Sequence, residues 1–141
     1  NDVVTAWIPA QPTPVEMGPL SFAYPLEVHK LVNAVKFEKA GAGYDRGVSE
    51  VFAKNDVTIN ETPFELGEVS FHHNLNFHTA SQNRTNRSRV VLANTYYKDG
   101  ARVINSPTMI SGDWQKFMPN VKPGDLAASP LNPICWPVDD E

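Results

Sequence analysis

Two residues of the sequence have the types and the spacing to bind a cofactor. His78 and Arg89 stand eleven residues apart, at the ends of a polar, turn-rich segment, residues 79–88. An imidazole can hold a transition metal through a ring nitrogen, and a guanidinium can grip a carboxylate with two parallel hydrogen bonds. If the flanking segments are adjacent antiparallel strands, both side chains can face one cavity and bind a 2-oxo acid beside a metal. Spacing alone also allows His78 to be a histidine in a polar turn and Arg89 to form a surface ion pair.

The segment that leads into His78 predicts a strand with two unlike faces. Residues 69–78 alternate strictly, as a half-buried strand does. The polar face carries Ser70, His72, Asn74, Asn76 and His78, and the largely apolar face carries Val69, Phe71, His73, Leu75 and Phe77. A row of short polar and imidazole side chains indicates a polar cavity rather than a plain solvent face.

The same alternation places the other polar residues of this segment. We expect Asn74 and Asn76 to line a substrate pocket, with asparagines that bond neighbouring backbone as the alternative. On a straight strand His72 lies about 20 Å from His78. This distance excludes His72 as a co-ligand and makes it a residue that lines the cavity or its rim. His73 is on the apolar face, where a core or interface histidine is expected.

The rest of the chain predicts short strands separated by glycine and proline. Strands are expected over residues 3–8, 20–24, 56–60 and 89–97. Asp99-Gly100 signals a hairpin that leads into residues 101–104. A short helix is predicted over residues 48–54, because Gly41, Gly43 and Gly47 interrupt any longer one.

This pattern favours a mainly all-β fold, a sandwich or a jelly-roll barrel. We expect residues 1–141 to form a single domain. Prolines recur from residue 106 onward, which disfavours a central strand there. Residues 106–141 are therefore predicted to be a proline-rich tail that wraps the domain.

Composition excludes several classes of partner. A formal net charge of −4 and a pI near 5.5 leave no basic excess to neutralise phosphates, so we expect no nucleic-acid partner. No apolar run approaches the roughly 18 residues of a membrane span, so no membrane partner is expected. Cys135 is the sole cysteine, which excludes an internal disulfide and a CxxC zinc site and favours a reducing, cytoplasmic location.

The residues around His78 and Arg89 resemble the phytanoyl-CoA dioxygenase family. The likeness lies in Gly67-Glu68 before the strand, in His78 followed by a small-residue turn and an asparagine, and in Arg89 eleven residues after the histidine. Three further segments fit in the same order: residues 3–8 with Gly18-Pro19-Leu20, residues 25–30 where members read Pro-Gly-Ser-His, and Lys122-Pro123-Gly124-Asp125 through Leu131-Asn132-Pro133. The Pro-Gly-Ser-His signature itself is eroded here to Pro25-Leu26-Glu27-Val28-His29. The resemblance therefore spans nearly the whole chain.

The resemblance implies a double-stranded β-helix, or jelly roll, that binds Fe(II) and 2-oxoglutarate. In that family two histidines and one carboxylate hold the iron and leave positions open for cosubstrate and O₂. By matching position, His78 is the distal histidine ligand and Arg89 binds the far carboxylate of 2-oxoglutarate. The implied activity is hydroxylation of a small organic or acyl substrate, with decarboxylation of 2-oxoglutarate.

The chain departs from the family pattern at the other iron ligands. The family's His-x-Asp pair precedes the strand that corresponds to residues 3–8, and no His-x-Asp occurs in the 141 residues. Ala80 stands where many members have a serine, and Ser81 follows one place later. We therefore expect the C-terminal part of a longer oxygenase, incomplete on its N-terminal side and inactive alone.

Two other classes of function stay open. A jelly roll without the metal triad can be a metal-free module that binds a small molecule or a sugar. A structural or interaction domain is the third hypothesis. Sheet edges left unpaired would then join a second copy of the chain in a homodimer.

Overall fold

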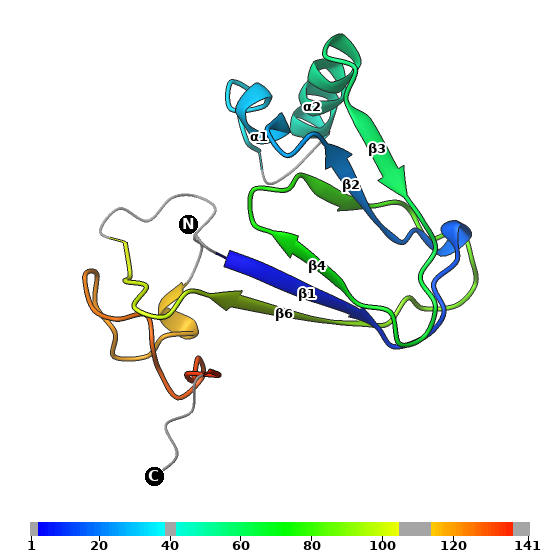
Figure 1. The fold of residues 1–141 in the computed structure, drawn as a ribbon. Helices are drawn as coiled ribbons and strands as arrows, with labels where there is room; N and C mark the ends of the chain where they lie inside the picture. Colours follow the sequence, from blue (N-terminus) through cyan, green and yellow to red (C-terminus); the bar gives the residue numbers. More distant parts are fainter. Residues whose placement is uncertain (1–2, 39–41, 105–113, 137–141) are drawn as a thin grey trace. The chain divides into compact units, whose positions relative to one another are not determined.

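A computed structural model describes residues 3–38, 42–104 and 114–136 of the chain (Figure 1). The chain divides into two compact units, Asn1–Tyr96 and Tyr97–Glu141. In chain order the elements are β1 (Val3–Pro9), η1 (Val15–Met17), β2 (Leu20–Tyr24), α1 (Val28–Leu31), α2 (Gly43–Lys54), β3 (Thr58–Glu61), β4 (Ser70–His73), β5 (His78–Ala80), β6 (Val91–Tyr97) and η2 (Trp114–Lys116). Within the described ranges, no helix is long and apolar enough to cross a membrane.

Two antiparallel sheets organise the first unit. One has the strand order β4-β1-β6 and the other β3-β2-β5. In the first sheet, the hydroxyls of Thr5 and Thr95 are 3.0 Å apart across β1 and β6. In the second, Phe22 of β2 is opposite His78 of β5. The predicted β-rich architecture is confirmed, and the edges of these sheets are β4, β6, β3 and β5. Pairing of a second copy at such an edge stays a prediction.

The core of this unit is built from β1, β2, the loop between them and α1. Its buried apolar residues are Ala6, Trp7, Met17, Leu20, Ala23, Val28 and Val32. The ring centroids of Trp7 and Phe64 are 4.8 Å apart. Burying a large aromatic side chain stabilises a fold by roughly 2–3 kcal/mol, so the burial of Trp7 is a substantial contribution to this core.

The prediction of one strand over residues 69–78 is wrong. The chain turns at residues 74–76, where the Asn76 amide donates to the His73 carbonyl at 2.9 Å. The segment thus contributes β4 to one sheet and β5 to the other. Within β4 the polar side faces inward, because His72 is 6% exposed and Phe71 is 70% exposed. A period of two residues identifies the two faces of a strand but not where the strand leaves its sheet.

Helix α2 is longer than the sequence predicts. It begins at Gly43 and continues through Gly47, where the prediction places interruptions. A Cβ atom at position 47 would lie 2.7 Å from Cγ1 of Val35. The lack of a side chain at Gly47 therefore allows close packing, which offsets the cost of about 1 kcal/mol that glycine brings to a helix.

In the second unit, residues 101–103 pair with residues 124–127. The Val103 amide donates to the Asp125 carbonyl at 3.0 Å, and the Gly124 amide donates to the Val103 carbonyl at 2.8 Å. The residues that follow the Asp99-Gly100 signal therefore pair, among the described residues, with a later loop segment and not with the predicted strand over residues 89–97. Of the predicted tail, residues 106–113 and 137–141 lie outside the described residues, and its wrapping of the domain stays a prediction.

Candidate functional site

His78 begins β5 with one ring nitrogen held by the main chain. Its Nδ1 lies 2.8 Å from the carbonyl oxygen of Asn76. Because a carbonyl accepts only from a protonated nitrogen, this contact places the proton on Nδ1 and leaves a lone pair on Nε2. Histidines that bind metals commonly have this arrangement, which fixes the tautomer and the ring orientation. The side chain is exposed, so its free nitrogen is available to a ligand.

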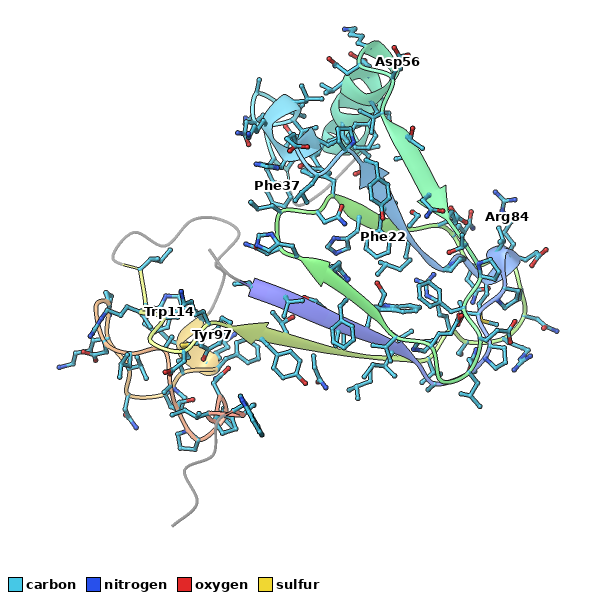
Figure 2. All side chains as sticks on the ribbon, in the orientation of Figure 1. Phe22, Phe37, Asp56, Arg84, Tyr97 and Trp114 are labelled. Carbon is cyan, nitrogen blue, oxygen red and sulfur yellow. The ribbon has the colours of Figure 1, made fainter. Side chains whose placement is uncertain are left out.

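His72 lies directly beside His78, on the other sheet. Their ring centroids are 4.6 Å apart, and Phe22 of β2 packs near both rings at 5.3 Å and 6.3 Å. Figure 2 shows Phe22 in the space between β4 and the second sheet. The separation of about 20 Å expected for a straight strand is therefore wrong, because the turn at residues 74–76 folds His72 and His78 toward each other.

The His72 imidazole is buried, and its Nδ1 has no hydrogen-bond partner among the described residues. Burial, and to a lesser extent the neighbouring His78, lower the pKa of His72 below its ordinary value of 6.5. Removal from water disfavours the charged imidazolium. The neutral ring that results is the form that can accept a hydrogen bond or bind a metal.

The two asparagines predicted to line a pocket have different surroundings. Asn76 is half-buried, and its side-chain oxygen is buried without a hydrogen-bond partner in the described part of the chain. Asn74 is exposed, and its amide extends the β1–β4 pairing by donating to the Val3 carbonyl at 3.0 Å. Asn76 thus belongs to the surroundings of His78, whereas the contact of Asn74 is structural.

Arg89 is anchored by main-chain oxygens from two loops. Its Nη1 donates to the carbonyl of Gly18, to that of Met17 at 3.2 Å and to that of Ser81 at 3.3 Å. All its hydrogen bonds within the described ranges run through Nη1, so Nη2 and Nε keep their donors. These two nitrogens share one edge of the guanidinium and can bind a carboxylate with two parallel hydrogen bonds.

Gly18 makes this anchoring sterically feasible. Its φ is +69°, in the left-handed region that glycine adopts readily. A Cβ atom at position 18 would lie 2.0 Å from the carbonyl oxygen of Ser81 and 3.0 Å from Nη1 of Arg89. Any side chain at this position would collide with the Ser81 carbonyl that accepts from Arg89. The sequence marks Gly18 only through its resemblance to a family turn, since its neighbours in space are distant along the chain.

Ser81 also helps to hold Arg89 in place and is itself bonded to β3. Its carbonyl accepts from Arg89, and its hydroxyl donates to Oε2 of Glu61 at 2.8 Å. Glu61 comes from β3, and no pattern in the sequence connects it with Arg89. The Ser81 hydroxyl is therefore used within the protein.

The segment between the two candidate residues, residues 79–88, is ordered by its own polar side chains. Oδ1 of Asn83 accepts from the amide of Thr85 at 2.9 Å and from its hydroxyl at 2.7 Å. The amide nitrogen Nδ2 of Asn83 donates to the Arg87 carbonyl at 2.7 Å. These bonds define the turn that carries the chain from β5 to Arg89.

The described residues fit part of an iron and 2-oxoglutarate site. Arg89 has the donors for a carboxylate, and His78 has a free ring nitrogen for a metal. Within the described ranges, no group of three or more His, Cys, Asp or Glu side chains stands close enough to hold a metal ion. The two-histidine, one-carboxylate set is therefore not made by these residues alone.

Comparison with known proteins supports the fold. No protein-family model and no curated protein sequence matches the chain. The chain is similar to the solved structure of the non-heme α-ketoglutarate-dependent carbocyclase SnoK from nogalamycin biosynthesis, with a TM-score of 0.67 and 23% identity over 93% of this chain and 47% of that enzyme. The non-heme α-ketoglutarate-dependent epimerase SnoN, from the same biosynthesis, gives a TM-score of 0.44 and 19% identity over 67% of this chain and 34% of that enzyme.

The chain spans about half the length of SnoK. What it shares with that carbocyclase is the fold. α-Ketoglutarate is the same compound as 2-oxoglutarate.

Proposed function

We propose that this chain is the C-terminal, cosubstrate-binding part of an Fe(II)- and 2-oxoglutarate-dependent oxygenase with a jelly-roll fold, of the phytanoyl-CoA dioxygenase type. One observation carries the proposal: His78 lies at one end of the β2–β5 ladder, Arg89 is bonded to residues just beyond its other end, and both side chains have free ligand-binding nitrogens. His78 is opposite Phe22, and Arg89 is bonded to Gly18 and Ser81, which flank the far end of that ladder. The fold shared with SnoK supports the class.

Each residue has a distinct role in this proposal. Arg89 holds the far carboxylate of 2-oxoglutarate, and the carbonyls on Nη1 orient its free edge beforehand. His78 offers Nε2 to the metal, and Asn76 keeps its ring in place. When bound, iron and 2-oxoglutarate supply an oxidative decarboxylation coupled to hydroxylation of a small organic or acyl substrate. His72 and Asn76 contribute polar groups to the substrate pocket, and the remaining iron ligands come from outside these 141 residues.

Binding of 2-oxoglutarate to the whole 141-residue chain tests the role of the arginine. In calorimetry with Co²⁺ present, we expect one site, and we expect Arg89→Lys to weaken binding at least about tenfold, because lysine lacks the paired planar donors. Arg102→Lys is the matched control, since Nη1 of Arg102 also donates to a carbonyl, that of Gly124 at 2.8 Å. Equal affinities for wild type and Arg89→Lys would contradict the proposal.

Turnover distinguishes this chain from a complete oxygenase. With Fe(II), 2-oxoglutarate and O₂, we expect the isolated chain to form no succinate, because an incomplete ligand set does not retain iron in a reactive site. Succinate formation would contradict this expectation. Binding of a small molecule or sugar that needs neither metal nor Arg89 would favour the metal-free binding module instead.

A further inference from the structure

The main chain on both sides of Arg89 is held by two consecutive residues of the loop that follows β1. The Ala10 amide donates to the Val90 carbonyl at 3.0 Å, and Nε2 of Gln11 donates to the Ser88 carbonyl at 2.8 Å. The first bond joins two main-chain groups, so any residue except proline could make it. The second needs the side chain of Gln11 and therefore depends on the sequence.

The same nitrogen of Gln11 also reaches the loop that anchors the guanidinium. Nε2 donates to the sulfur of Met17 at 3.1 Å, and the Met17 carbonyl accepts from Nη1 of Arg89 at 3.2 Å. A side-chain amide nitrogen carries two hydrogens, so it can serve the sulfur and the Ser88 carbonyl together. Because Met17 is 1% exposed, its sulfur belongs to the packed core of the unit.

Gln11 thus connects the two ends of Arg89. It holds the residue that directly precedes the arginine, and it holds the methionine whose carbonyl accepts from the guanidinium. A bridge between these two points limits the directions in which Nη2 and Nε can face. A side chain whose orientation is fixed in advance loses less conformational entropy when a ligand binds.

We propose that Gln11 is a positioning residue for Arg89, which keeps the free edge of the guanidinium turned toward the far carboxylate of a 2-oxo dicarboxylic acid. The inference rests on the proposed function for the identity of that ligand. It adds a residue that neither the spacing of the candidate residues nor the family resemblance marks. Gln11 acts through the arginine, so its loss should weaken binding only while Arg89 is present.

NMR of the arginine side chains in the whole 141-residue chain tests the positioning without any ligand. Hydrogen bonds at Nη1 slow rotation about the bond between Cζ and Nη1, so an anchored guanidinium gives separate signals for its two Nη groups. The sequence has five arginines, and Arg89→Lys identifies the signals of Arg89 by their loss. We expect Gln11→Met, which removes the donor and nearly keeps the length, to speed this rotation at least about threefold.

Gln82→Met is the matched control for the rotation rate. Gln82 lies on the same loop as Arg89, residues 79–88, and its side chain is exposed. The same substitution there should leave the rotation of the Arg89 guanidinium unchanged. Gln11→Asn is a second variant in case Gln11→Met does not fold. It keeps the amide but shortens the side chain by one methylene group, so it should also speed the rotation.

Calorimetry with 2-oxoglutarate and Co²⁺ shows whether the effect passes through the arginine. In the wild-type background, Gln11→Met should weaken binding roughly three- to tenfold, because the guanidinium must then be ordered by the ligand. In the Arg89→Lys background, the same substitution should change the affinity by less than about twofold. A residue that only stabilises the fold would weaken binding equally in both backgrounds.

The outcomes separate this inference from the proposed function. An unchanged rotation rate in folded Gln11→Met or Gln11→Asn would overturn the positioning role, and so would equal losses of affinity with and without Arg89→Lys. If the wild-type chain bound no 2-oxoglutarate, the proposed function would be contradicted. The rotation rate of the Arg89 guanidinium would then still decide whether Gln11 positions it.

Discussion

The candidate site has an arginine end around Arg89 and a histidine end around His72, Asn76 and His78. The two ends differ in how many of their polar atoms have hydrogen-bond partners within the chain. At the arginine end, Nη1 of Arg89 donates to carbonyls from two loops. At the histidine end, Nδ1 of His72 and Oδ1 of Asn76 are buried without a partner in the described ranges. An end that is satisfied internally is organised before a ligand arrives and stabilises the fold, whereas unsatisfied buried atoms cost stability until a ligand binds.

Gly18→Ala should have the largest effect, because it disrupts the arginine end itself. The new Cβ would collide with the Ser81 carbonyl at a backbone conformation that disfavours side chains. We expect the free energy of unfolding to fall by about 3 kcal/mol or more in urea denaturation. Gly67→Ala is the control, since Gly67 also has a positive φ but nothing within 4 Å of its Cβ position. It should cost only about 1 kcal/mol, and equal losses would show that the close approach is unimportant.

Arg89→Met is expected to lower the free energy of unfolding by about 2 kcal/mol, because it removes charge-assisted hydrogen bonds to three main-chain carbonyls. Arg102→Met loses a single exposed bond to Gly124 and should cost about 0.5 kcal/mol. Urea denaturation of both variants provides the comparison. If the two losses were the same, Arg89 would not be an organised anchor.

His72→Phe should act in the opposite direction to Arg89→Met. Without metal, replacing a buried ring that has an unpaired nitrogen by an apolar ring of similar size is expected to raise the free energy of unfolding by about 1 kcal/mol. His73→Phe, which loses the bond from the Leu75 amide, should lower it by about 0.5 kcal/mol. Thermal and urea denaturation in the presence of a chelator measure both. If His72→Phe were less stable than wild type, the unpaired nitrogen of His72 would not lower the stability of the fold.

The smallest expected effect is a dependence of stability on pH at the histidine end. The pKa of His72 is lower in the folded chain than its ordinary value of 6.5, so the unfolded chain binds the proton more readily. The stability that the fold has while His72 is neutral is therefore complete above pH 6.5 and is lost as the pH falls through the folded pKa. With a chelator present, the free energy of unfolding should fall less between pH 7.5 and pH 5 in His72→Phe than in wild type. Parallel pH profiles would contradict the assignment.

Much of the secondary structure follows from local preference. The runs at residues 3–8, 20–24 and 89–97 form β1, β2 and β6, because β-branched and aromatic residues favour strands and prolines end them. The types and spacing of His78 and Arg89 likewise predict ligands for a metal and a carboxylate, and these roles stay a prediction. The strand break at residues 74–76 was missed because an alternating pattern does not show where a strand ends. The passage of α2 through Gly47 was missed because it depends on close packing against Val35.

By itself, then, the sequence determined which segments extend and which two groups are suited to a metal and a carboxylate. These properties reside in individual side chains and their immediate neighbours. Only the tertiary structure decided which groups meet: it brings His72 of one sheet to His78 of the other, and it seats Arg89 on Gly18, 71 residues away. Such contacts depend on which sheet each strand joins, and that choice is made by the packing of the whole unit rather than by any local pattern.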